Sequence, residues 1–135
     1  LSFTGVKGVK LIGTNLWNTA GVGKRAGHFA KDLIFADSFL AQDINMASST
    51  FVQDYKNIFN EEPGVFEVQG YDAGLLLRQL INQGNTTREA LTTALAQVKD
   101  FPGAVGSLSM SPDKEIIRPV VALTLDSGGN VIPFK

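Results

Sequence analysis

The side chains that could carry out chemistry are too scattered in this 135-residue chain to predict a catalytic centre. His28 is the only histidine and cysteine is absent, so a Ser-His-Asp triad or a zinc site would have to be built around His28. No partner stands at a recognisable spacing from it. Glu61, Glu62 and Glu67 flank a helix break, where acidic side chains favour the start of the next helix. The sequence therefore predicts no catalytic residue, no metal and no cofactor, and we do not expect an enzyme.

A glycine-rich segment has the pattern of a dinucleotide-binding turn without its context. Gly21, Gly23 and Ala26 match the Gly-x-Gly-x-x-Ala fingerprint, and Asp43 follows at about the right distance for a ribose contact. The fingerprint needs its glycines directly after a strand, whereas the preceding predicted strand ends well before them. Gly27 also interrupts the short helix that follows. We therefore interpret the segment as a flexible surface turn.

The best candidates for ligand binding lie in the loop after the first predicted strand, at residues 9–13. Thr14, Asn15, Trp17 and Asn18 offer a hydroxyl, two amides and an indole. Ligands of open α/β sheets usually bind beyond the carboxyl ends of strands, and a Trp among small polar residues is a common ligand platform. We predict that these four residues bind a ligand. The alternative is that the Trp only covers the edge of the core.

A secondary candidate is the pair Tyr71 and Asp72, which places a phenol and a carboxylate at the border of an apolar helix stripe. Such a pair could contact a ligand. The competing interpretation, which the sequence favours, is a buried carboxylate whose hydrogen bonds are satisfied inside the fold.

The composition indicates a globular domain. Hydrophobic residues make up 44% of the chain, charged residues 19%, and the net charge is -1. No run of Lys and Arg could follow a phosphate backbone, so no nucleic-acid partner is expected. Apolar stretches are far shorter than the roughly 20 residues that span a bilayer. Because the chain begins at Leu1 rather than Met, we expect it to be a piece of a longer protein whose targeting segment lies outside it.

The elements that must position these side chains are predicted in an α/β order. Short runs of β-forming residues bounded by turn residues indicate strands, and the stretch between the first two leaves room for only a short helix. The C-terminal strands read as an antiparallel meander. The predicted strands are residues 9–13, 33–39, 105–110, 116–126 and 131–134.

Three consecutive helices are predicted between the second and third strands. The first opens at residues 48–50, with Thr50 and Gln53 at capping-box spacing, and the second covers residues 65–83. Thr86 and Glu89 form the same spacing ahead of the third helix. Since three helices need a sheet to cover, we expect strands from outside this chain to complete it.

Five features of the chain, in this order, resemble the trailing part of type I periplasmic solute-binding proteins, the leucine/isoleucine/valine-binding group. Each feature alone is weak, and the order and spacing carry the resemblance over nearly the whole chain. The features are Leu11-Ile12-Gly13-Thr14-Asn15-Leu16-Trp17, the strand Leu33 to Phe39, Phe51-Val52-x-x-Tyr55-x-x-x-Phe59, Gly70-Tyr71-Asp72-Ala73, and Phe101-Pro102-Gly103-x-x-Gly106.

The resemblance implies an α/β fold whose two lobes close on a small ligand, with three chain crossings between the lobes. This chain would be the C-terminal portion, with parallel strands, covering helices and a C-terminal antiparallel hairpin. Residues 1–45 would supply second-lobe strands, residues 46–100 helices of the first lobe, and residues 101–135 strands near the hinge.

The resemblance also implies a function. It predicts a periplasmic or extracellular protein that captures a small ligand, such as an amino acid, for ABC transporter membrane subunits or a sensor. Amino-acid binders of this family are similar in placing an acidic residue where Asn15 stands, and an amide brings no charge. The chain is also similar to lipoprotein activators of penicillin-binding proteins. The alternative is therefore a regulator that binds a cell-wall synthase and no small ligand.

Two further expectations concern the surroundings of the chain. A lipid anchor attached through a segment outside it would suit a location at the cell envelope. A chain that lacks part of its sheet exposes strand edges and apolar helix faces, which favours pairing with a second copy. A homodimer of this chain is therefore one of the expected states.

Overall fold

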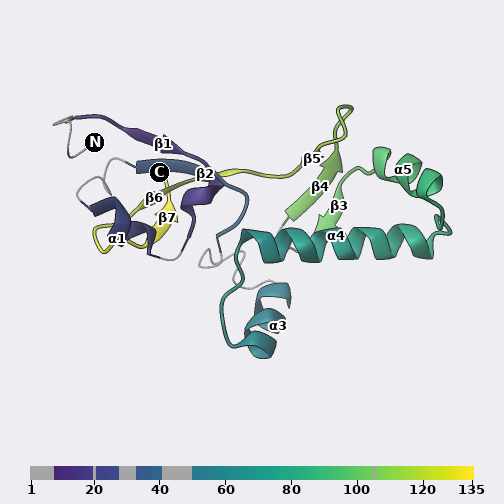
Figure 1. Cartoon of the computed structure of the whole chain (residues 1–135), viewed down its shortest axis with the longest axis horizontal. Helices are drawn as coiled ribbons and strands as arrows, with labels where there is room; N and C mark the ends of the chain where they lie inside the picture. Colours follow the sequence, from purple (N-terminus) through teal and green to yellow (C-terminus); the bar gives the residue numbers. More distant parts are fainter. Residues whose placement is uncertain (1–7, 20, 28–32, 41–49, 105) are drawn as a thin grey trace.

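The computed structural model describes residues 8–19, 21–27, 33–40, 50–104 and 106–135. The sequence predictions for His28, for Asp43 and for the helix start at residues 48–49 lie outside the described residues. Within the described residues, the helices and strands follow one another in a mixed α/β order, with three consecutive helices between the second and third strands, and the strands form two separate sheets (Figure 1).

The larger sheet has four strands in the order β1-β2-β6-β7. These are β1 (Leu11–Gly13), β2 (Leu33–Asp37), β6 (Val121–Leu125) and β7 (Val131–Pro133). β1 and β2 are parallel, with Leu11 opposite Leu33, whereas β6 runs antiparallel to β2, with Phe35 opposite Leu123. β6 and β7 form a hairpin. The predicted parallel strands and C-terminal antiparallel hairpin are therefore confirmed.

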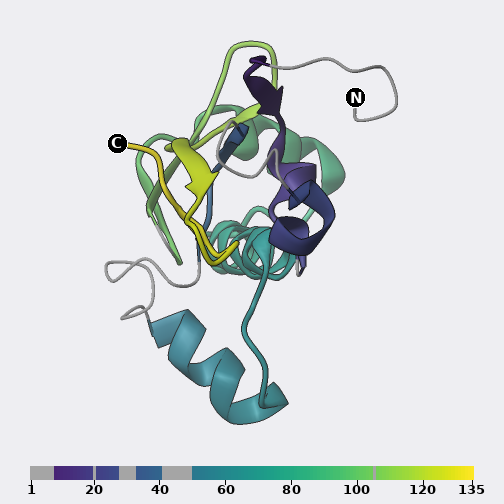
Figure 2. The same ribbon diagram turned by 90° about the vertical axis from the view of Figure 1, so that its left-hand side faces the viewer.

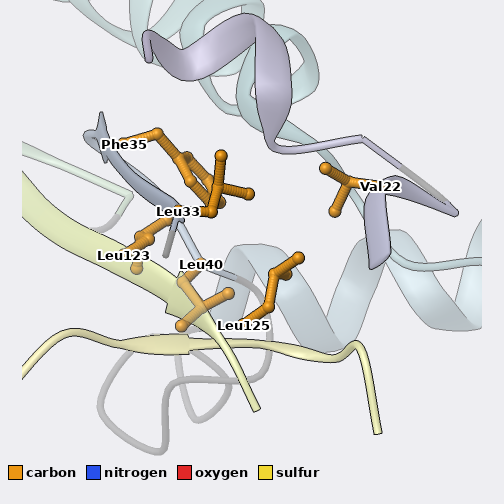
Figure 3. Close-up of a cluster of buried hydrophobic side chains, with 6 residues drawn as sticks. All are labelled: Val22, Leu33, Phe35, Leu40, Leu123 and Leu125. Atoms are coloured by element: carbon orange, nitrogen blue, oxygen red, sulfur yellow. The ribbon is translucent and has the colours of Figure 1, made fainter. Parts of the chain in front are cut away.

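The core of this sheet forms on one face. Side chains alternate between the two faces of a strand, so Leu33 and Phe35 of β2 are both buried while Ala36 is exposed. The short helix α1 (Val22–Ala26) covers this face, and a short helix was predicted in this stretch. The buried cluster consists of Val22, Leu33, Phe35, Leu40, Leu123 and Leu125 (Figure 3).

The rest of the chain combines three helices with a smaller antiparallel sheet. The helices are α3 (Thr50–Phe59), α4 (Val65–Asn82) and α5 (Arg88–Ala96), and the strands are β3 (Phe101–Gly103), β4 (Gly106–Met110) and β5 (Ile116–Ile117). Leu76 and Leu80 of α4 pack on Phe101 and Leu108, while α5 packs beside them. α3 projects away from both sheets (Figures 1 and 2) and contacts α4 through Phe51 and its neighbours. We refer to this half, residues 50–117, as the helical part.

The predicted cap of α5 is wrong by one residue. Thr87, not Thr86, is the N-cap, because its extended backbone places its hydroxyl to accept a 3.2 Å hydrogen bond from the N–H of Ala90. Thr86 is exposed and precedes the cap. Two adjacent threonines carry the same chemical signal, and Glu89 lies within the first turn in either register.

The predicted strand at residues 116–126 is also wrong, because it is two strands in different sheets. β5 ends at Ile117 and β6 begins at Val121, and the residues between them cross from one sheet to the other. Pro119 cannot donate to a strand ladder, so it breaks the run. The strand β3 was not predicted, since Pro102 and Gly103 read as a turn. It lies at the edge of its sheet, where proline is tolerated.

Candidate functional site

The loop after β1 forms a single tight turn. Thr14 is exposed and has an extended backbone, and Asn15–Trp17 form one turn of 3-10 helix, η2. The turn is closed by a 3.0 Å hydrogen bond from the N–H of Trp17 to the carbonyl of Thr14 and a 2.9 Å bond from the N–H of Asn18 to the carbonyl of Asn15. The loop therefore presents its side chains from a fixed backbone beyond the carboxyl end of β1.

Trp17 lies at the edge of the core. Its indole is half-buried and packs against the sheet cluster, and the adjacent Leu16 is 67% exposed. The indole also lies directly on the backbone of Gly13, since a Cβ at that position would approach the ring to 2.2 Å. The close approach requires glycine at residue 13. Part of the indole therefore stabilises the sheet, and the part that remains exposed is free to contact a ligand.

Asn18 ties the loop to the end of β2. Its side-chain amide donates to Asp37 Oδ2 at 2.8 Å and to the carbonyl of Phe39 at 2.9 Å. Asp37 is only 3% exposed, and its other oxygen accepts a 2.6 Å hydrogen bond from the N–H of Ser38. Asp37 was not among the predicted site residues, although an acidic residue at the end of an apolar strand is a signal that could have identified it. It positions Asn18.

An open hollow of about 670 Å³ lies next to this loop, within the roughly 300 to 1,000 Å³ typical of ligand pockets. We refer to the larger sheet β1-β2-β6-β7 with η2 and α1 as the sheet half. One wall of the hollow comes from the sheet half, with Asn18 among its residues, and another comes from the segment that precedes α4. Sequence reasoning did not identify the second wall or the β6–β7 turn. The lining residues are Asn18, Thr19, Gly21, Val22, Phe39, Glu62, Pro63, Gly64, Gly129, Asn130, Val131 and Ile132.

The four predicted loop residues are adjacent in space, but only one of them lines this hollow. Asn18 is part of the wall, whereas Thr14, Asn15 and Trp17 lie along the same turn outside the lining. Asn15 is half-buried. The loop therefore borders the hollow rather than filling it.

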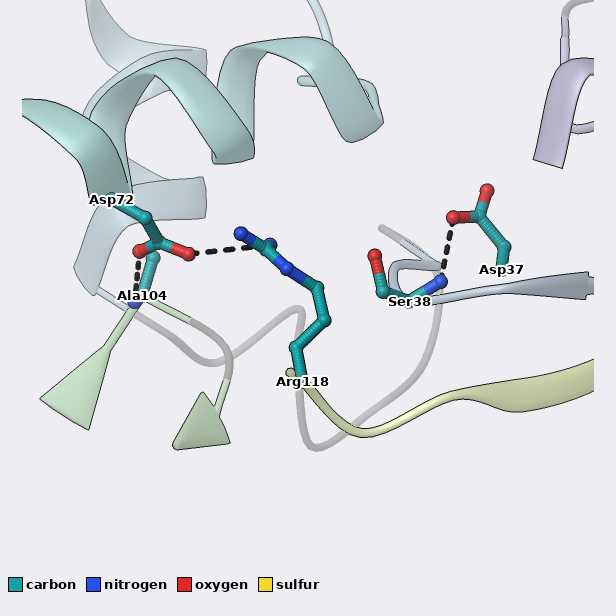
Figure 4. A network of polar contacts seen from close by, with 5 residues as sticks. All are labelled: Asp37, Ser38, Asp72, Ala104 and Arg118. Atoms are coloured by element: carbon teal, nitrogen blue, oxygen red, sulfur yellow. Dashed lines mark hydrogen bonds and ion pairs between the residues drawn. The ribbon is translucent and has the colours of Figure 1, made fainter. Parts of the chain in front are cut away.

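The secondary pair Tyr71 and Asp72 lies in the helical part and does not line the hollow. Tyr71 is 41% exposed, and its ring centroid is 4.6 Å from that of Phe51. Asp72 is 2% exposed, and its carboxylate accepts a 2.7 Å hydrogen bond from the N–H of Ala104 and pairs with Arg118 at 3.4 Å (Figure 4). The two neighbours thus point into different surroundings.

Two titratable groups among the described residues have shifted pKa values. Partial burial raises the pKa of the Tyr55 hydroxyl, and the charges of Glu61 and Glu67 raise it further. A hydrogen bond from the Asn130 side chain, supported by one from the Asn130 backbone, lowers the pKa of Asp126. Asp126 therefore stays ionised and fixes the β6–β7 turn that forms part of the wall.

Two negative findings hold for the described residues alone. No group of three or more His, Asp or Glu side chains there could hold a metal ion. None of the described helices is both long enough and apolar enough to cross a membrane.

Solved structures share this fold over nearly the whole chain. A leucine binding protein from Thermotoga maritima is 22% identical, with a TM-score of 0.76, and the match covers 99% of this chain and 38% of that one. The branched-chain amino acid transporter substrate binding protein LivJ from Streptococcus pneumoniae, in complex with isoleucine, is 23% identical with a TM-score of 0.71 over 90% of this chain and 35% of that one.

A third similar structure holds a different ligand. It is a solute binding protein of an ABC transporter from R. palustris in complex with benzoate, 25% identical with a TM-score of 0.68, and the match covers 93% of this chain and 35% of that one. This chain therefore spans less than two fifths of the length of each of these three proteins. A comparison with curated protein sequences found no significant match.

A match to a family model assigns this chain to a protein family. The model described as periplasmic binding protein matches residues 2–130, which is almost the whole chain. The fold shared with the leucine and branched-chain amino acid binding proteins is the one that the sequence features resembled. This chain belongs to the periplasmic binding protein family and has the type I fold of that group.

Proposed function

We propose that this chain is part of an extracytoplasmic solute-binding protein that captures a small ligand between two lobes and delivers it to an ABC transporter. The observation that carries the proposal is the hollow of about 670 Å³, because its walls come from both halves of the molecule. Asn18 lies on the sheet side, whereas Pro63 and Gly64 lie on the helical side. A ligand that contacts both walls favours the arrangement in which the walls are close. Family membership supports the extracytoplasmic location.

The two halves correspond, in this proposal, to parts of the two lobes. The sheet of β1, β2, β6 and β7 is the second-lobe part, and the helical part belongs to the first lobe. The chain crosses between them after β2 and again between β5 and β6. The larger sheet has one buried cluster and the helical part another, which suits two bodies that change their relative angle. A third cluster packs Phe39, just after β2, against α3 and α4.

The ligand, in this proposal, is a small organic carboxylate. Isoleucine and benzoate, which are bound by two of the similar proteins, share that group. Asn15 can donate to a carboxylate through its amide NH₂ or accept from an ammonium through its carbonyl, and it carries no charge. A neutral residue at this position therefore does not restrict the ligand to amino acids.

Asn15→Asp in the intact binding protein is expected to change the affinity for two probes in opposite directions. The new carboxylate can bond the ammonium of isoleucine, and a charge-assisted bond is worth about 1.5 to 3 kcal/mol, or roughly tenfold to hundredfold tighter binding. Benzoate has no ammonium, so its carboxylate would face a like charge and bind more weakly. Titration calorimetry measures both affinities.

The matched control is Asn57→Asp, the same chemical change on the exposed side of α3. It should leave both affinities unchanged. If Asn15→Asp also leaves them unchanged, Asn15 does not contact the ligand, and its proposed role is wrong.

A thermal-shift screen of small carboxylates tests the function itself. A ligand present at 100 times its Kd adds about 2.7 kcal/mol to the free energy of unfolding, which raises the melting temperature measurably. A wild-type protein that no member of the panel stabilises would contradict a solute-binding role. That result would support the alternative, a regulator that binds a cell-wall synthase on the same fold.

A further inference from the structure

Two chain crossings join the sheet half to the helical part, and their sheet ends lie next to each other. The segment Arg118–Val120 connects β5 to β6, and the other crossing leaves the end of β2. Asp37 at the end of β2 is paired with Val121 at the start of β6, so the two crossings begin at adjacent positions in the sheet. Two neighbouring chain segments that join two bodies can serve as a hinge, because a few residues there absorb the change of angle.

A buried ion pair fastens one crossing to the helical part. Asp72 is on α4, and its Oδ2 lies 3.4 Å from the guanidinium of Arg118, whose side chain is 14% exposed. Its Oδ1 accepts the 2.7 Å hydrogen bond from Ala104 in the β3–β4 turn. One carboxylate thereby joins a helix, a turn of the smaller sheet and the crossing segment (Figure 4).

The same place includes the end of β2. Ser38, Asp72, Arg118 and Pro119 line one hollow of only about 10 Å³, about the volume of a single water probe. The hollow is too small for a ligand, and its lining brings both crossings against the ion pair. Since Asp72 is almost completely buried, its charge strongly favours keeping Arg118 within reach.

We propose that Asp72 and Arg118 are positioning residues of the hinge, which fix the angle between the two halves and so set the affinity for ligand without touching it. This inference rests on the proposed function only for its effect on affinity. A hinge held at one angle presents two prearranged walls, whereas a loosened hinge populates many angles. Binding then selects a smaller fraction of the molecules, and the apparent affinity falls by that fraction.

The direct test measures the angle in the absence of ligand. This chain contains no cysteine, so spin labels attached to Lys10→Cys and Gln83→Cys, with any cysteine elsewhere in the intact protein replaced, report the distance between the sheet half and the end of α4. Both positions are exposed. Asp72→Asn keeps an acceptor for Ala104 but loses the ion pair, so the distance distribution is expected to broaden, and Arg118→Gln should broaden it equally.

Two variants separate positioning from general stability. Arg118→Lys keeps the positive charge and should restore a narrow distribution, at least in part. Lys56→Gln removes the exposed 2.7 Å pair with Glu62 on the helical part and should leave the distribution as in the wild type. If either single substitution prevents folding, the double variant Asp72→Asn with Arg118→Gln is used instead, because it leaves no unpaired buried charge. Its distance distribution is expected to broaden in the same way.

Affinity for isoleucine, taken as the probe, gives the second reading. Asp72→Asn and Arg118→Gln are each expected to weaken binding about tenfold, with the distance in the ligand-bound state unchanged. Folded variants whose ligand-free distribution matches the wild type would overturn the inference. Should the wild type bind no carboxylate, the proposed function fails while the distance measurement still decides the hinge.

Discussion

The two sheets of this molecule are assembled in different ways. The smaller sheet uses three consecutive strands within residues 101–117, each paired with its neighbour in sequence. The larger sheet pairs β2 with β6, and the hydroxyl of Thr124 donates a 2.7 Å hydrogen bond to the carbonyl of Leu33 across 91 residues of chain. The smaller sheet therefore depends on local contacts, and the larger one depends on segments that the whole helical part separates.

Both halves bury one set of apolar side chains and leave others exposed. Phe35 and Leu123 at the centre of the larger sheet are 1% and 0% exposed, whereas Ile12 of β1 in the same half is 81% exposed. In the helical part, α4 buries Leu76 and Leu80 but leaves Phe66 at 65% exposed. The buried cluster of the larger sheet and that of α4, α5 and the smaller sheet share no residue. We therefore expect the two halves to be stabilised separately.

Truncation of a core side chain in each half tests whether the two halves are stabilised separately. Leu123→Ala is expected to lower the free energy of unfolding by about 2 to 5 kcal/mol, because it opens a cavity in a fully buried site. The variant should shift the urea transition followed by Trp17 fluorescence, since Trp17 packs on the same cluster. Leu76→Ala is the counterpart in the helical part and should chiefly shift the circular dichroism of the helices. Equal shifts of both signals in both variants would show one cooperative unit.

Two glycine substitutions sharpen the comparison, because one is expected to lower the free energy of unfolding and the other to raise it. Gly23→Ala places a Cβ 2.2 Å from the carbonyl oxygen of Gly129, so backbone must shift and about 1 to 3 kcal/mol of stability is lost. Gly74→Ala in α4 meets no atom within 4 Å and should gain roughly 0.5 to 1 kcal/mol, since glycine weakens helix interiors. Thermal denaturation of both variants measures the difference. A loss at Gly74 would mean that its face of α4 is covered.

The smallest expected effect concerns the cap of α5. Thr87→Ala removes the hydroxyl that accepts from the N–H of Ala90 and should cost about 1 kcal/mol of stability. Thr86→Ala is the control, one residue away and exposed, and should be close to neutral. Because α5 belongs to the helical part, circular dichroism should report the loss while Trp17 fluorescence stays nearly unchanged. The opposite ranking of the two variants would restore the cap predicted from the sequence.

Local signals in the sequence predicted most helices and strands. They could not predict which residues far apart in the sequence pair with each other. The apolar run of β2 and the leucine stripe of α4 are each contained in a short window, so their periods could be read directly. The break at Pro119 had a local signal, the proline itself, which was overlooked. The partner of Asp72, which lies 46 residues away, depends on which sheet each strand joins. No local period encodes that choice.

The candidate site, too, could be predicted from the sequence only where it depends on local signals. The loop from Thr14 to Asn18 could be identified because it follows a strand, and ligand contact by its four candidates stays a prediction. The wall at Pro63 and Gly64 could not be identified from the sequence, because it reaches the hollow only through the arrangement of the two halves. Asp37 was overlooked although its position at the end of an apolar strand was visible.

The long-range pairing of β2 with β6 also has a consequence during biosynthesis. At about 5 to 20 residues per second, the ribosome needs roughly 5 to 20 s to extend the chain by the 91 residues from Leu33 to Thr124. Throughout that interval the nascent β2 has an unpaired edge, and Leu33 and Phe35 lack their contacts with Leu123 and Leu125, while the helical part can already fold from local contacts. The nascent chain is therefore most exposed to aggregation in this interval, and it is then that a chaperone bound at β2 would protect it best.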